Sequence, residues 1–262
     1  MIVVVLVALG LILGSFVNAL AWRLHEHKDW VSDRSECPHC HHKLAPQDLI
    51  PVLSWLGLRG KCRYCQHSIP DTPLTELAVP ALFVASYYWW PQPLHGAGLF
   101  TFVLWLVFVV GFVALALYDF RWFTLPNNMV YPLVGLAIAQ AFVLSGVYHT
   151  GWQALAGAGA GVVIVSGLFY LLYQVSKGTW IGGGDVKLAI VLGLLAGGPL
   201  RSALLLFVAS CAGTLFALPQ LLTGKASRKA HVPFGPFLIL GLFVVKLFGA
   251  GMIAWYSSLV AL

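Results

Sequence analysis

Charged residues are scarce in this sequence of 262 residues. They make up 9% of it, against about 25% in a typical soluble domain. Hydrophobic residues make up 60%, and the mean hydropathy is +0.86. This balance excludes a soluble enzyme, a disordered chain and a secreted disulfide scaffold. Apolar runs such as 98–118, 152–175 and 200–222 reach or approach the roughly 20 residues that a helix needs to cross a bilayer. The sequence therefore predicts an all-α polytopic membrane protein.

Eight apolar segments predict about eight transmembrane helices. The first, 1–22, lacks the basic start of a signal peptide and exceeds the 7–15 residues of a signal core, so we interpret it as a spanning helix. The others are 76–90, 98–118, 129–147, 152–175, 186–198, 200–222 and 233–260, of which 76–90 and 186–198 are short. We expect three parts: the first helix at 1–22, a polar loop domain at 23–75, and a core of about seven spans at 76–262.

Positive charge exceeds negative charge, with a net charge of +6. The basic residues are scattered along the chain, so we interpret the excess as membrane topology and expect no nucleic-acid partner. If 23–75 is cytoplasmic and the spans alternate, all the Lys and Arg residues except Arg201 and Lys246 lie on the cytoplasmic side. The cytoplasmic cations are then Arg23, Lys28, Arg34, Lys43, Arg59, Lys61, Arg63, Arg121, Lys177, Lys187, Lys225, Arg228 and Lys229. This bias predicts an N-terminus outside and a cytoplasmic loop.

Two CxxC pairs in the polar loop indicate a metal site. Cys37 and Cys40 form the first pair, and Cys62 and Cys65 form the second after 21 intervening residues, a spacing close to that of a zinc ribbon. Four thiolates complete a tetrahedral shell around zinc and leave no open position, which indicates a structural role. Disulfides are the alternative, but they are rare in the cytoplasm, where the charge pattern places this loop. Substitute ligands are available in the neighbouring histidines, although the four thiolates already satisfy the ion.

Acidic residues almost disappear after Glu76. The remaining 186 residues contain only Asp119 and Asp185, each at the expected cytoplasmic end of an apolar segment. Carboxylates at membrane depth are costly and are therefore functional candidates. Two that lie close together can share a proton, so that one activates water while the other protonates the peptide carbonyl or leaving nitrogen. This pattern favours peptide hydrolysis, although Asp185 could also cap a helix.

Two other classes of function compete with a peptidase. A proton-coupled transporter uses intramembrane aspartates as protonation sites, but it predicts carboxylates near the midplane and inverted repeats, and no repeat is visible here. A zinc-ribbon membrane adaptor without catalysis leaves the two isolated aspartates unexplained. We therefore expect a peptidase, with the transporter as the alternative.

The order of the motifs resembles that of the bacterial type IV prepilin peptidases, which are GxGD-type aspartyl proteases of the inner membrane. The resemblance covers nearly the whole chain. Its successive segments are GSFVNALAWRL at 14–24, SECPHC at 35–40, LSWLGLRGKCRYC at 53–65, PLTEL at 73–77, the Asp119 segment, GGGDVKLA at 182–189 and VPFGPFLILG at 232–241. Members of this family remove the basic leader of prepilins and pseudopilins after a glycine on the cytoplasmic side. Those with the cysteine loop commonly also methylate the new N-terminus with S-adenosylmethionine.

The resemblance implies roles for individual residues. Asp119 and Asp185 match the catalytic pair, and the four cysteines match the zinc site. Candidates for substrate binding or methyl transfer are Glu76, Gly182, Gly184 and Lys187. One departure is visible, because the family usually continues to Leu-Pro-Asp after the first aspartate, whereas this sequence has Asn127 and Asn128 after Leu125-Pro126.

Overall fold

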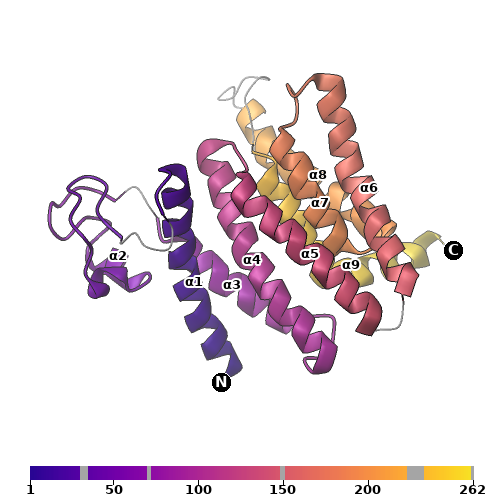
Figure 1. Cartoon of the computed structure of the whole chain (residues 1–262), viewed down its shortest axis with the longest axis horizontal. Coiled ribbons are helices and arrows are strands. Elements are labelled where there is room, and N and C mark those ends of the chain that lie inside the picture. Colours follow the sequence, from indigo (N-terminus) through magenta and orange to yellow (C-terminus); the bar gives the residue numbers. More distant parts are fainter. Residues whose placement is uncertain (30–34, 70–71, 148–150, 223–232, 261–262) are drawn as a thin grey trace. The chain divides into compact units, whose positions relative to one another are not determined.

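The computed structural model describes residues 1–29, 35–69, 72–147, 151–222 and 233–260 (Figure 1). Within these ranges the regular structure is helical, and the only β pairing is two isolated bridges. The all-α prediction is thus confirmed. Four cations used in the charge argument lie outside the described ranges: Arg34, Lys225, Arg228 and Lys229. The helices are α1 (Ile2–His25), the 3-10 helix η1 (Pro46–Leu49), α2 (Leu53–Gly57), α3 (Leu74–Tyr88), α4 (Gly96–Trp122), α5 (Asn127–Val147), α6 (Gly151–Ser176), α7 (Gly183–Ala196), α8 (Pro199–Leu222) and α9 (Gly235–Val260).

Six of the described helices are long and apolar enough to cross a membrane: α1, α4, α5, α6, α8 and α9. This is fewer than the eight expected. The difference comes from α3 and α7, which have 15 and 14 residues and occupy the two segments noted above as short. At 1.5 Å per residue, each reaches only about 22 Å, less than the roughly 30 Å of the hydrocarbon core.

The chain divides into two compact units. The first contains residues 1–88 and 105–117, and the second contains 89–104 and 118–262. Helix α4 therefore contributes its middle to the first unit and both of its ends to the second. The cysteine loop belongs to the first unit, whereas Asp119 and Asp185 belong to the second.

In the first unit, α1 packs closely against α3 because glycines face it. A Cβ on Gly10 would lie 2.5 Å from the Pro80 Cα, and one on Gly14 would lie 2.7 Å from the Glu76 Cα. Small residues permit such close approach of membrane helices. Gly14 thereby brings the start of α3, and Glu76 with it, directly against α1.

In the second unit, α7 lies against α5, α6 and α9, and α8 packs on α6 and α9. The contact between α6 and α7 is as close as that between α1 and α3, because a Cβ on Gly193 would lie 2.7 Å from the Gly161 carbonyl carbon. The Ser166 hydroxyl also donates to the Val186 carbonyl oxygen at 3.0 Å. Short α7 therefore lies against three longer helices (Figure 1).

Candidate functional site

Asp119 lies in the last turn of α4 and is 6% exposed. Helix α4 ends just after it, where Phe123 adopts a left-handed conformation and donates its backbone N–H to the Asp119 carbonyl oxygen at 2.9 Å. The Oδ2 atom of Asp119 is buried and has no hydrogen-bond partner among the described residues. A buried carboxylate oxygen needs a donor, so this site is chemically incomplete without a water, a proton or a substrate.

Asp185 is the third residue of α7. The helix begins at Gly183 with Gly182 as its N-cap, so Asp185 lies in the first turn and does not itself cap the helix. Its backbone N–H donates to the Gly182 carbonyl oxygen at 3.1 Å. A carboxylate in a first turn faces the positive end of the helix dipole.

The two aspartates come together within the second unit. Asp119 lies at the end of α4 and Asp185 at the start of α7, and both α4 and α7 border the start of α9. Between the helices that carry them stands Gly235, at the start of α9. A Cβ on Gly235 would lie 2.8 Å from the Asp119 Oδ2 and 3.6 Å from the Leu188 Cδ2, one turn beyond Asp185. Three helix ends thus converge on one pair of carboxylates.

The other candidates near Asp185 surround the same turn. A Cβ on Gly184 would lie 2.9 Å from the Leu125 Cβ, so this position requires glycine for the approach of the α4–α5 connection. Gly182 has only the carboxylate of Asp185 and a neighbouring backbone atom within 4 Å of its Cβ position. Lys187 donates to the Asn127 Oδ1 at 2.8 Å, which joins α7 to the residue that replaces the family's usual aspartate.

The four predicted cysteines gather into one cluster in the first unit. The Sγ atoms of Cys37, Cys40, Cys62 and Cys65 all lie within 4.8 Å of one another, and none of these cysteines is in a disulfide. Four thiolates at this spacing repel one another, so their joint ionisation requires a cation at the centre. The donor set fits tetrahedral zinc. The resemblance of this loop to a zinc ribbon is thus supported by the cluster.

The two cysteine pairs have the same backbone arrangement, displaced by 25 residues. In the first, the Cys37 N–H donates to the His42 carbonyl oxygen, and Glu36 forms a β-bridge with Lys43. In the second, the Cys62 N–H donates to the His67 carbonyl oxygen, and a β-bridge joins Lys61 to Ser68. We call these two segments, 35–44 and 60–69, the first and second knuckles. Aromatic contacts join them, because His39 stacks on His67 with ring centroids 3.9 Å apart and the His42 and Tyr64 ring centroids are 3.7 Å apart.

The thiols of this cluster differ in acidity. Burial raises the pKa of Cys37, but the backbone N–H groups of Cys40 and His39 outweigh it and lower the pKa to about 7. The His67 N–H lowers the pKa of Cys65, whereas burial and the three neighbouring thiols raise it to about 12. The Cys37 thiol thus ionises readily and the Cys65 thiol resists ionisation, as expected where nearby negative charges disfavour one another.

Asp48 fastens η1 to the second knuckle. Its carboxylate accepts hydrogen bonds from the Arg63 Nε at 2.6 Å and the Tyr64 hydroxyl at 3.2 Å, and from the Ala45 backbone N–H. Burial alone raises the pKa of Asp48, but Arg63 and the other donors hold it below its ordinary value.

Glu76 fastens the loop to the start of α3. Its Oε2 accepts the Val52 backbone N–H at 2.6 Å. Val52 has a φ of +61°, a conformation that a β-branched residue adopts only when its surroundings impose it. Glu76 thus holds a strained residue at the entry of α2, and it lies in the first unit, away from the aspartates in sequence and in unit assignment.

Comparison with known proteins agrees with this geometry. Residues 8–90 match the bacterial peptidase A24 N-terminal domain, and residues 106–218 match the type IV leader peptidase family. A protein of Bacillus subtilis named prepilin leader peptidase/N-methyltransferase is 32% identical over 257 residues, covering 97% of this chain and 98% of its own length. The chain belongs to the type IV leader peptidase family.

Other type IV leader peptidases with the same name extend the similarity. The protein of Stutzerimonas stutzeri is 30% identical, with 95% of this chain and 91% of the relative covered, and that of Pseudomonas aeruginosa is 29% identical, with 93% and 89% covered. No solved structure is significantly similar to the chain. Family membership makes this protein a multi-pass membrane peptidase of the inner membrane, and the transporter alternative is not favoured.

Three residues of these sites were not predicted from the sequence. Gly235 was part of a quoted motif, but only the fold places it against Asp119. Asn127 was noted as a departure, and its contact with Lys187 depends on how α5 and α7 pack. Asn18 has a buried Oδ1 atom without a hydrogen-bond partner among the described residues, a feature that no local sequence pattern reveals.

Proposed function

We propose that this protein is a membrane aspartyl endopeptidase whose catalytic residues are Asp119 and Asp185. The observation that carries the proposal is that the only two acidic residues after Glu76 lie at the ends of α4 and α7, both of which border Gly235 at the start of α9. Gly182 and Gly184 are proposed to let a substrate backbone approach Asp185, and Lys187 to contribute to substrate binding.

The chemistry follows from two carboxylates that share one proton. The ionised carboxylate removes a proton from a water molecule, whose oxygen forms a bond to the peptide carbonyl carbon. The protonated partner donates to the carbonyl oxygen, and when the carbon–nitrogen bond breaks, a proton passes to the leaving nitrogen. The unpartnered Oδ2 of Asp119 supports this scheme, because a shared proton or a bound water would supply the donor that it lacks.

The proposed substrates are type IV prepilins or type II secretion pseudopilins, cut after a glycine on the cytoplasmic side. The names of the relatives and the sequence resemblance support this choice. We propose the orientation from the cation bias, with the N-terminus outside and the cysteine loop in the cytoplasm. In this scheme 1–22 is the first span, 23–75 the cytoplasmic loop domain and 76–262 the protease core.

A second proposed step of the same enzyme is N-methylation of the new N-terminal residue. S-adenosylmethionine would supply the methyl group: the lone pair of the neutral amine nitrogen would form the new nitrogen–carbon bond as the carbon–sulfur bond breaks. S-adenosylhomocysteine would leave with that electron pair, and the methylated nitrogen would release a proton to water. The four cysteines would hold a structural zinc that keeps the loop folded. Glu76 is the proposed methyl-transfer residue, supported by its position between the loop and α3.

The test of the peptidase is a pair of isosteric variants. Asp119→Asn and Asp185→Asn should each reduce cleavage of a co-expressed prepilin by at least about 1,000-fold, because neither remaining carboxylate has its acid–base partner. Intact mass of the purified substrate measures cleavage. Asp29→Asn, at an exposed position, is the matched control and should cleave normally. Substantial turnover by either aspartate variant, free of wild type, would disprove the dyad.

The test of the methylation step is Glu76→Gln. The glutamine carbonyl can still accept the Val52 N–H, so the loop stays attached while the negative charge is lost. We expect a substrate that is cut at the normal rate but unmethylated, read from the same intact mass. Glu26→Gln, at the exposed end of α1, is the control. A methylated product from Glu76→Gln at normal yield would remove this residue from the reaction.

A further inference from the structure

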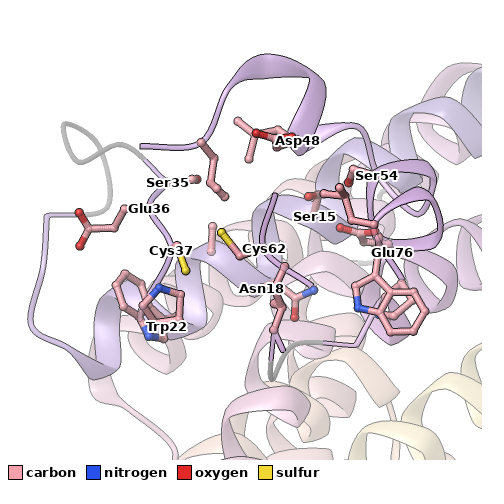
Figure 2. Close-up of a pocket in the computed structure, with 18 of the residues that line it drawn as sticks. Ser15, Asn18, Trp22, Ser35, Glu36, Cys37, Asp48, Ser54, Cys62 and Glu76 are labelled. Carbon is pink, nitrogen blue, oxygen red and sulfur yellow. The ribbon is translucent and has the colours of Figure 1, made fainter. Parts of the chain in front are cut away.

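A cavity of about 240 Å³ lies within the first unit, between α1, the two cysteine knuckles and the start of α3 (Figure 2). Ser15, Asn18 and Trp22 line it from α1, Asp48 from η1 and Glu76 from α3. The volume lies just below the roughly 300–1,000 Å³ of sites for drug-sized ligands, so it suits a portion of a ligand of about nucleoside size. Neither Asp119 nor Asp185 lines this space.

The polar atoms of the cavity call for a ligand that donates hydrogen bonds. Asn18 is one of the residues that line the cavity, and its Oδ1 atom is buried and has no partner among the described residues. A buried acceptor without a donor costs free energy, which makes such an atom a sign of a missing partner. Asn18 projects from α1 toward the space where the Glu76 side chain also lies (Figure 2).

The charges of the cavity call for a positive ligand. Three carboxylates and two arginines line it. Glu36 pairs with Lys28 at 2.6 Å, Asp48 pairs with Arg63 at 2.6 Å, and Arg23 donates to the Ser35 hydroxyl at 3.3 Å. Glu76, the third, accepts the Val52 backbone N–H and has no ion-pair partner among the described residues. Its negative charge is therefore left for whatever occupies the cavity.

Two indole rings complete the cavity. Trp22 lies in the second-last turn of α1 and carries the Lys28 ammonium 4.5 Å from its ring centroid. Trp55 comes from α2 and is held against the backbone of Gly60, whose φ of +69° lets the chain turn there into the second knuckle. Aromatic rings stack on flat heterocycles and attract cations.

We propose that this cavity is the binding site of the methyl donor, S-adenosylmethionine. The Asn18 Oδ1 accepts an N–H of the ligand, Glu76 faces its positive charge, and Trp22 and Trp55 contact its purine. A ligand that combines a purine, N–H donors and a sulfonium cation satisfies the orphan acceptor, the unpaired carboxylate and the rings together. This assignment rests on the proposed methylation step and locates it in the first unit.

The test measures binding, not turnover, with purified full-length protein that retains its zinc, in lipid nanodiscs. Titration calorimetry with S-adenosylmethionine should show a dissociation constant about tenfold or more higher for Asn18→Leu than for wild type, because the buried acceptor is lost. Asn18→Asp keeps the acceptor and should bind within a fewfold of wild type. Asn128→Leu, at an exposed position of α5, is the matched control and should bind normally.

A second comparison tests the charge. Wild type should bind S-adenosylmethionine more tightly than S-adenosylhomocysteine, which has no sulfonium. Glu76→Gln should reduce this ratio toward one. An unchanged ratio in Glu76→Gln would overturn the proposed role of the carboxylate.

Photo-crosslinking separates a failed inference from a failed function. In the wild-type protein, an azido-adenosyl analogue should label peptides that contain Trp22 or Trp55. This experiment does not depend on whether the Asn18 variants fold. Labelling within 89–262, or displacement from the cavity by a processed prepilin peptide alone, would overturn the site but leave methylation standing. If wild type binds no donor and its substrates stay unmethylated, both the site and the proposed methylation step fail, whereas the peptidase test is unaffected.

Discussion

The carboxylate of Asp119 has its position only because residue 235 carries no side chain. A single methyl group there would lie 2.8 Å from the Asp119 Oδ2, well inside van der Waals contact. Glycine 235 is therefore a positioning residue of the proposed dyad.

We predict that Gly235→Ala lowers kcat for prepilin cleavage by about 100-fold with little change in KM, because a displacement near 1 Å is enough to disturb a catalytic geometry. Gly251→Ala, in the same helix with nothing within 4 Å of its Cβ position, should leave both constants unchanged. Steady-state kinetics with a purified prepilin measures the two variants. Normal kcat in Gly235→Ala would show that Asp119 tolerates the methyl group.

At this scale the sequence predicts residues whose chemistry is conspicuous in an apolar chain. Asp119 and Asp185 are conspicuous because carboxylates are costly in a membrane, and the cysteines because their spacing matches a metal site. Gly235 and Asn18 are ordinary residues in a glycine-rich membrane protein. Their importance arises from atoms more than 50 residues away in the chain, and no local pattern encodes that approach.

Among the helices, the contact between α1 and α3 controls where Glu76 lies. Gly10 and Gly14 face Pro80 and the Thr75–Glu76 backbone, so the two helices meet without intervening side chains. In lipid, packing of this kind takes the place of the hydrophobic effect as a source of association. The sequence indicated close packing at these glycines, but not which helix they would meet.

We predict that Gly14→Val separates α1 from α3 and destabilises the protein by about 1–3 kcal/mol, as expected for an overpacked contact. Methylation should fall more than cleavage, because Glu76 moves while the aspartates belong to the other unit. Ala8→Val, at an exposed position of α1, is the control. Thermal unfolding in detergent and the methylated fraction of cleaved substrate are the measurements, and equal losses of both activities would contradict the prediction.

Helix lengths were the least predictable property of the elements. All eight apolar segments became helices, yet α3 and α7 are too short to cross a bilayer alone. Composition reports that a segment is apolar, whereas its length as a helix depends on where caps form. Helix α7 ends where Gly197 adopts a left-handed backbone conformation, and hydropathy carries no information about such a cap.

For the molecule as a whole, each of the two units carries one of the two proposed reactions. The dyad lies in the second unit, and the cysteine cluster, Glu76 and the cavity lie in the first. The first unit's loop has few buried apolar side chains: Cys37 and Cys62 are its only core residues among the described positions 35–69. Metal binding must therefore supply much of the folding free energy of this loop.

We predict about one zinc per chain by elemental analysis. A chelator that removes it should make the segment 35–69 sensitive to limited proteolysis and leave the helices of the second unit protected. Acidification should act in the same direction, because zinc binds thiolates and its affinity falls as they are protonated. A loop that resists protease with no metal, or that contains two disulfides, would refute the zinc site.

The 25-residue repeat of the two knuckles has a consequence for how this loop can vary in length. Each knuckle closes locally, within the stretches 35–44 and 60–69, and the ion needs only that both reach it. A longer segment between the two knuckles costs little folding free energy, because the entropy of closing a loop grows only with the logarithm of its length. This segment carries Asp48 and Trp55 to the cavity. Insertions or deletions between the two knuckles should therefore leave zinc binding intact while they change the shape of the cavity. The metal site and the ligand specificity of the cavity can thus change independently.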